Sequence, residues 1–136
     1  MATNYILPYS PNSFFIISGH NGLVHSIHAT SFGLISCDIT GVIIERDFWN
    51  CIEEGPSLRI LRCPEGVNCM TCDSKYIVCG LLNKKLAVYD RKSLDLVQNL
   101  LGHTDHIWSV DMTKDWIVSG SWDATVKLWN RYSISL

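Results

Sequence analysis

Residues 100–130, LLGHTDHIWSVDMTKDWIVSGSWDATVKLWN, decide the fold of this chain. The stretch contains three short runs rich in β-branched and aromatic residues, a composition typical of β-strands. The residues between the runs favour tight turns. Three strands in so short a stretch leave no room for a helix. The predicted strands are His106 to Met112, Trp116 to Ser119 and Thr125 to Trp129.

The order of residues in this stretch resembles a WD repeat, which forms one four-stranded blade of a β-propeller. Gly102-His103 stands at one end, and residues 128–130, Leu-Trp-Asn, stand at the other end, where the repeat's signature has Trp-Asp. The resemblance implies a buried structural tetrad of hydrogen-bonding side chains, which here are His103, Ser119, Asp123 and Trp129.

The chemistry of these four residue types agrees with that assignment. A carboxylate in a turn accepts a hydrogen bond from an imidazole N–H, and the other imidazole nitrogen accepts from a hydroxyl. The hydroxyl oxygen in turn accepts the indole N–H. The four side chains together therefore leave no buried donor or acceptor unsatisfied.

The same pattern recurs twice earlier in the chain. A period of about forty residues, as expected for this family, places residues 75–80 on 115–120 and residues 86–90 on 126–130. A second shift places Gly19-His20 on Gly102-His103 and so reveals a first copy of the repeat. In this alignment its third strand, Val42 to Ile44, needs a one-residue deletion in the turn before it. The chain thus contains three repeats.

The sequence therefore predicts an all-β fold of three four-stranded antiparallel WD-type blades, a partial β-propeller. Residues 1–136 form a single WD-repeat array in this interpretation. Each blade opens with its outer strand, and these strands are expected at Phe14 to Ile17, Ser57 to Arg62 and Leu94 to Leu101. The predicted blades are approximately 14–47, 57–90 and 94–130, with 131–136 starting a further outer strand.

The three copies differ at the tetrad positions. The last copy alone has all four residues. The first copy keeps His20 and Ser36 but has Glu45 near the tryptophan position. The middle copy has other residues throughout, namely Cys63, Cys79, Asn83 and Tyr89.

Three blades are too few to close a ring, because propellers have four to eight. An open array leaves an apolar blade face uncovered at each end. We therefore expect the chain to be part of a larger propeller, a truncated product, or a half-ring that pairs with a second copy of itself.

Composition and charge limit the kinds of partner and the cellular location that we expect. The chain is 47% hydrophobic and 18% charged, as in globular proteins, and its net charge of −2 creates no field that attracts nucleic acid or an anionic membrane. The N-terminal apolar stretch lacks a basic leading region and is broken by Pro8 and Pro11, so it does not predict a signal peptide. We expect an intracellular protein, cytoplasmic and/or nuclear, that binds neither nucleic acid nor membrane.

Metal binding and catalysis find little support in the sequence. Cys69 and Cys72 form a C-x-x-C within a predicted strand, where their odd separation directs the two thiols to opposite faces. No nucleophile motif, phosphate loop or second cysteine pair accompanies them. We expect no metal, no cofactor and no catalytic residues. A small β-rich metal-binding protein or enzyme is the alternative of another class.

Binding to other proteins or peptides is the function that the resemblance implies, because loops at one rim of such a ring recognise partners. The rim positions in the last repeat are Trp122 and His106, and Trp108, the third candidate partner-binding residue, either lines the central channel or packs inside. Trp122 is the leading candidate, because an aromatic residue on an exposed turn is typical of interface hot spots. The alternative is that Trp122 lies flat against its own blade.

The last repeat is also similar to repeats of F-box/WD-repeat proteins, the substrate-recognition subunits of ubiquitin ligases. The similar phrases are Gly-His-Thr-Asp, Ile-Val-Ser-Gly-Ser-Trp-Asp and Val-Lys-Leu-Trp-Asn. The sequence thus favours a non-catalytic protein-interaction scaffold, with a substrate-recognition fragment of such a ligase as the alternative.

Overall fold

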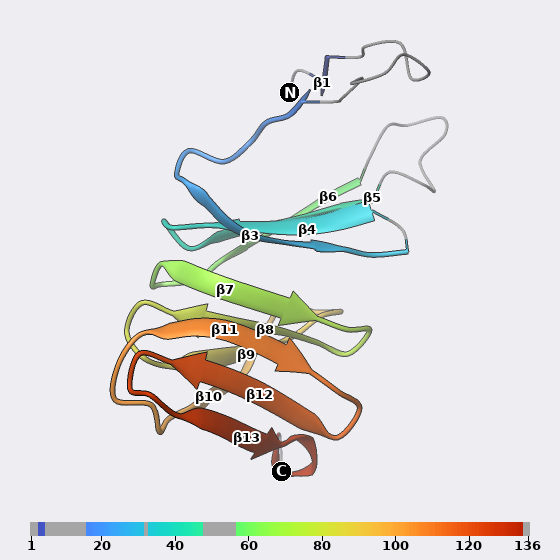
Figure 1. Cartoon of the computed structure of the whole chain (residues 1–136). Coiled ribbons are helices and arrows are strands. Elements are labelled where there is room, and N and C mark those ends of the chain that lie inside the picture. The colour runs from blue at the N-terminus through green and yellow to red at the C-terminus, as the bar shows by residue number, and fades with distance from the viewer. Residues whose placement is uncertain (1–2, 5–15, 32, 48–56, 135–136) are drawn as a thin grey trace, which may run out of the picture.

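The computed structural model describes residues 3–4, 16–31, 33–47 and 57–134. Its described elements are β-strands and one short 3-10 helix, η1 (Arg131–Ser133). Figure 1 shows the three larger sheets stacked on one another in chain order. The predicted all-β class and the partial-propeller architecture are confirmed.

Each larger sheet is an antiparallel meander in which neighbouring strands are consecutive in the chain. The first sheet contains β3 (Val24–Ala29), β4 (Gly33–Asp38), β5 (Val42–Asp47) and β6 (Ser57–Arg62). The second contains β7 (Val67–Cys72), β8 (Tyr76–Leu81), β9 (Leu86–Asp90) and β10 (Leu96–Leu100). The third contains β11 (Ile107–Met112), β12 (Trp116–Ser121) and β13 (Val126–Asn130) among the described residues. A further pair is formed by β1 (Thr3–Asn4) and β2 (Ile16–Ile17).

The sheets are offset by one strand from the blades predicted from the sequence period. Strand β6 pairs with β5, and β10 pairs with β9, so each completes the sheet before it and does not open the next one. The antiparallel strand order explains the offset, because a chain that reverses after the third strand reaches that strand's free edge directly. The sheets consequently cover 24–62, 67–100 and 107–130, where the repeats suggested 14–47, 57–90 and 94–130.

The interior consists of two apolar layers on either side of the second sheet. One layer lies between the first and second sheets and includes Ile35, Ile43 and Ile77. The other lies between the second and third sheets and includes Val78 and Ile107. Every residue of β7 and β8 is buried, as expected of strands covered on both faces.

The C-x-x-C pair lies on β7 with its two thiols in different layers. Cys69 packs in the layer toward the third sheet, and Cys72 packs in the layer toward the first. The predicted orientation to opposite faces is therefore confirmed. Burial raises the pKa of both thiols to about 11. Within the described part of the chain, no group of three or more His, Cys, Asp or Glu side chains is placed to hold a metal ion.

The segment after β13 is a turn where the sequence suggested the start of a strand over 131–136. The Asn130 side chain accepts a hydrogen bond from the Tyr132 backbone N–H (2.9 Å), and Ser133 Oγ donates to the Asn130 carbonyl (2.7 Å). These bonds favour a 3-10 turn over an extended chain. Ile134 follows in extended conformation and is buried, while residues 135–136 and Phe14–Phe15 lie outside the described residues. No helix in the described residues has the length and apolar character needed to span a membrane.

Candidate functional site

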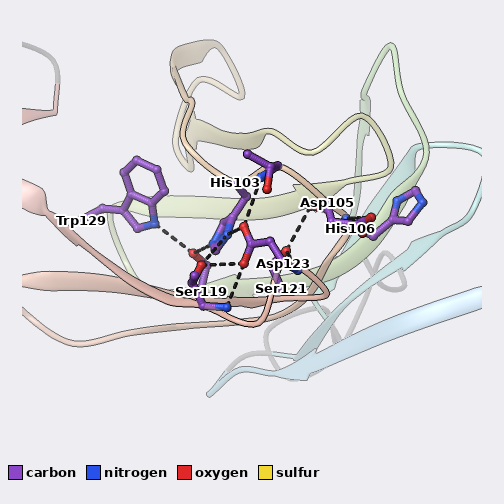
Figure 2. Close-up of polar contacts among 9 residues, drawn as sticks. His103, Asp105, His106, Ser119, Ser121, Asp123 and Trp129 are labelled. Carbon is purple, nitrogen blue, oxygen red and sulfur yellow. Dashed lines mark hydrogen bonds and ion pairs between the residues drawn. The ribbon is translucent and has the colours of Figure 1, made fainter.

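The structure brings His103, Ser119, Asp123 and Trp129 together in one hydrogen-bonded chain (Figure 2). His103 Nδ1 lies 2.7 Å from Asp123 Oδ2, and His103 Nε2 lies 2.7 Å from Ser119 Oγ. Trp129 Nε1 donates to the same Ser119 Oγ at 2.9 Å. Every donor and acceptor is satisfied when the imidazole carries its proton on Nδ1. The His103 side chain is fully buried.

Local turn structure holds the Asp123 carboxylate in place. Its Oδ1 accepts hydrogen bonds from the backbone N–H (2.9 Å) and the hydroxyl (2.5 Å) of Thr125. Its Oδ2 accepts a further bond from the Thr104 backbone N–H (3.1 Å). Ala124 adopts a positive φ of 68°, which closes the turn between β12 and β13. The carboxylate thereby ties this turn to the segment that precedes β11.

These bonds predict a specific dependence of stability on pH. Hydrogen bonds from Thr125 and then His103 lower the pKa of Asp123 below its usual value of 3.8. The unfolded chain therefore takes up this proton first, so stability is complete above pH 3.8 and is lost as the pH falls toward the folded pKa. We expect Asp123→Asn to be less stable at neutral pH and to lose less stability than wild type on acidification. Urea unfolding from pH 7 to pH 3 measures this.

The matched control for the pH measurement is Asp111→Asn. Asp111 is an exposed acid on β11 of the same sheet, and its Oδ1 accepts only from the neighbouring Met112 backbone N–H among the bonds assigned to it. This variant should keep the acid slope of wild type. Equal slopes for wild type and Asp123→Asn would contradict the prediction.

A related network is present in the first sheet. His20 Nδ1 lies 2.6 Å from Asp38 Oδ2, and His20 Nε2 lies 2.7 Å from Ser36 Oγ. The guanidinium of Arg46 donates to Ser36 Oγ (3.5 Å) and to the Ser18 carbonyl (2.7 Å). Arg46 is 2% exposed, and burial lowers its pKa. A buried guanidinium thus stands where the third sheet has an indole.

This network corrects the assignment of the tryptophan position in the first copy. The register of β4 and β5 places Arg46, not Glu45, at the position that Trp129 holds in the third sheet. An ungapped shift would have found it, because no deletion occurs in the turn. Glu45 points elsewhere and forms ion pairs with Arg59 (3.1 Å) and Arg91 (2.8 Å).

The acid of the first network was missed from the sequence. Asp38 pairs with Val24 at the end of β4, as Ser121 pairs with Ile107 at the end of β12. A carboxylate at that register position still reaches His20. The repeated Asp-x-Thr phrase was the available signal, since Thr40 donates to Asp38 Oδ1 as Thr125 donates to Asp123.

The second sheet replaces the tetrad with sulfur and phenol groups. Cys63 forms hydrogen bonds with Cys79 and Tyr89, which lower the pKa of the Cys63 thiol. The bond with Cys63 and complete burial raise the pKa of Cys79 well above its usual value. Asn83 instead accepts from the Lys85 backbone N–H (3.2 Å) in its own turn.

The three candidate partner-binding residues lie together at one end of the third sheet. The Trp108 and Trp122 rings are 4.8 Å apart between centroids and tilted by 39°. The His106 ring meets Trp122 edge-on at 5.4 Å. Trp122 is 63% exposed and Trp108 is 49% exposed, so their contact leaves much of both rings open to solvent. We call Trp108, Trp122 and His106 the aromatic rim.

Backbone geometry positions the aromatic rim. The pairing of β11 with β12 shifts register between Ile107 and Ser109, which is a bulge at Trp108. The Trp122 backbone N–H donates to the His106 carbonyl (2.9 Å) and fixes the turn against the segment before β11. Figure 2 shows His106 on the side of this segment away from Trp129.

A charged hollow of about 750 Å³ lies at the opposite ends of the strands, between the first and second sheets. Arg59 and Arg91 line it, and both are paired with Glu45. Arg59 also donates to the backbone carbonyls of Arg91 and Lys92. Both arginines that line the hollow are thus already paired with other groups of the same chain.

Comparison with known proteins agrees with this architecture. The family model "WD domain, G-beta repeat" matches residues 94–130. U4/U6 small nuclear ribonucleoprotein PRP4 of Saccharomyces cerevisiae is 40% identical over 58 residues, which is 41% of this chain and 12% of that protein. Autophagy-related protein 16 of Arabidopsis thaliana is 34% identical over 64 residues, which is 45% of this chain and 13% of that protein. Cell division control protein 4 of Saccharomyces cerevisiae is 31% identical over 65 residues, which is 47% of this chain and 8% of that protein.

Solved structures with the same fold cover more of the chain. U3-55K has a TM-score of 0.72 at 22% identity, covering 85% of this chain and 38% of that structure. The WD40 repeats of RRP9 have a TM-score of 0.72 at 24% identity, covering 85% of this chain and 37% of that structure. This chain therefore spans less than half of either structure and a small part of the sequence relatives. Residues 94–130 match the WD-repeat family model, and the larger sheets have the fold of blades in a partial WD40 β-propeller.

Proposed function

We propose that this chain is a non-catalytic protein-interaction module that binds other proteins or peptides at its aromatic rim. The observation that carries the proposal is the exposure of Trp122 and Trp108, at 63% and 49%, beside each other on one blade. Tryptophan contributes a large contact area with few rotatable bonds, which is why it is enriched at binding hot spots.

The tetrad supports this proposal because it makes the rim rigid. Asp123 directly follows Trp122, and its carboxylate is fixed by hydrogen bonds to Thr104 and Thr125. His103 anchors the same segment that leads to His106. A site that is ordered before binding loses little conformational entropy when the partner arrives.

Two of the histidines, His103 and His20, give further support to binding over catalysis. Both ring nitrogens of His103 are engaged by Asp123 and Ser119, and both of His20 by Asp38 and Ser36. Imidazoles held in this way stabilise the fold and have no free nitrogen for proton transfer to a substrate.

The test compares two tryptophan variants of the whole chain. We expect Trp122→Ala to reduce the amount of each specifically captured protein by about tenfold or more, as for a hot-spot residue. Trp116→Ala is the matched control, because Trp116 is 41% exposed on the same sheet but begins β12, at the other end from the Trp122 turn. Quantitative capture from a cell extract measures both. Equal capture by wild type and Trp122→Ala would refute the proposal.

We also propose that the third sheet packs against a further blade. A Cβ added to Gly80 of the second sheet would meet Ile107 of the third, whereas one added to the corresponding Gly120 would meet nothing within 4 Å. The same outer face exposes Val126 (68%) and Leu128 (60%). Light scattering distinguishes a half-ring that pairs with a second copy, which gives twice the chain mass, from a piece of a larger propeller. A well-packed monomer would contradict both.

The ligase-fragment alternative and the intracellular location stay predictions.

A further inference from the structure

We propose that the Trp108–Trp122 pair receives a positively charged side chain, arginine or lysine, from the partner protein. This inference deepens the proposed function and depends on it. It specifies which kind of side chain the partner presents, because exposed tryptophans alone do not indicate this.

The geometry of the pair suits a flat or compact cation. The two rings are tilted by 39° at 4.8 Å, so they form a shallow angle and not a closed stack. Their exposed faces carry the negative part of the aromatic quadrupole, which attracts a guanidinium or ammonium group. His106 closes one side by meeting Trp122 edge-on.

The charges nearest in the chain to these rings are negative. Asp123 follows Trp122 directly, and the hydrogen bonds that fix its carboxylate also favour its ionised form. Asp105 precedes His106, and its backbone carbonyl accepts from Ser121 Oγ (3.1 Å), which holds it against the Trp122 turn. Its Oδ1 accepts from the His106 backbone N–H (2.7 Å), and Oδ2 has no partner assigned within the described residues. The Asp123 carboxylate is 6% exposed and is paired within the tetrad, so Asp105 supplies the carboxylate that adjoins the aromatic rim in the chain.

The opposite end of the blades shows the same combination already occupied by cations. The Tyr76 ring is covered by Lys75 Nζ at 5.1 Å and by the Arg131 guanidinium at 5.2 Å. Arg131 also forms an ion pair with Asp73 at 2.6 Å. Across the described residues, both assigned cation–π contacts lie on Tyr76. The chain thus supplies cations to this ring but leaves the two tryptophans for a cation from outside.

A basic ligand fits this surface better than an acidic or a wholly apolar one. An acidic side chain would be repelled by Asp105 and Asp123, and an apolar one would cover the Asp105 carboxylate without pairing it. A guanidinium or ammonium group satisfies the rings and the Asp105 carboxylate at once.

The experiment selects random linear peptides on phage against the immobilised full chain. We expect selected peptides to share an arginine or lysine. For a synthetic selected peptide, replacing that residue by the neutral citrulline or norleucine should weaken binding roughly fivefold to thirtyfold, as expected for one cation–π contact. Trp122→Ala should lose a similar factor, and Trp116→Ala should not.

A second variant keeps the test independent of any structural effect of losing Trp122. Asp105→Asn preserves side-chain shape and should weaken the basic peptide but not its neutral analogue. Selected peptides that need Trp122 but contain no basic residue would overturn this inference and leave the proposed function standing. Failure to obtain any peptide that depends on Trp122 would overturn both.

Discussion

Replacing Ile77 by alanine is expected to destabilise the chain by about 2–5 kcal/mol. Ile77 lies on β8 with no exposed surface and packs in the layer between the first and second sheets. Alanine would leave a cavity there, because the flanking β-sheets are held by backbone hydrogen bonds and relax only partly. Urea unfolding followed by circular dichroism measures the free energy of unfolding.

The matched control for this prediction is Ile27→Ala. Ile27 lies on β3 and is 72% exposed, so the same chemical change creates no cavity and should alter the unfolding free energy by about 0.5 kcal/mol or less. The comparison tests whether the sheets pack into one cooperative unit. A small effect at Ile77, equal to that at Ile27, would mean that the layer between the first two sheets does not contribute to stability.

Replacing Ser119 by alanine is expected to cost about 2–4 kcal/mol, because two buried partners lose their hydrogen bonds at once. Ser119 Oγ is 2.7 Å from His103 Nε2 and accepts from Trp129 Nε1 at 2.9 Å. Neither ring gains a replacement partner from a methyl group. The loss should appear as a lower midpoint in thermal and urea unfolding.

Ser109→Ala is the control for the tetrad. Ser109 is an exposed residue on β11 of the same sheet, and its substitution should change stability by about 0.5 kcal/mol or less. If Ser119→Ala and Ser109→Ala lowered the free energy of unfolding equally, the tetrad would not contribute to stability. The rigidity argument for the aromatic rim would then lose its basis.

The tetrad of the last repeat was predictable because all four residues lie within one repeat. Asp123 and Trp129 are close in the chain to Ser119, and alternation along β12 and β13 determines which side chains share a face. The first network was harder to predict. Its acid, Asp38, stands at the position of Ser121 and not at that of Asp123, and its cation, Arg46, stands where the third sheet has Trp129.

His106 and Trp122 were predicted at the rim from the sequence, but the place of Trp108 and the arrangement of the three rings were not. Its turn position made Trp122 the leading candidate for an exposed aromatic residue, with packing flat against its own blade as the alternative. Its contact with Trp108 depends on the bulge in β11, and a bulge leaves little trace in the sequence. The role proposed for the Asp105 carboxylate depends on that arrangement.

The sequence by itself indicated the all-β class and the three repeats, because hydrophobic alternation, turn residues and repeat spacing are local properties. Its resemblance to a WD repeat implied the residues of the last tetrad. Only the tertiary structure decided which sheet each outer strand joins, since Ser57–Arg62 has the same local pattern in either sheet. It also decided that the chain turns at Arg131–Ser133 and buries Ile134. These outcomes depend on which free edge and which apolar layer lie within reach of the chain, and those are properties of the assembled sheets.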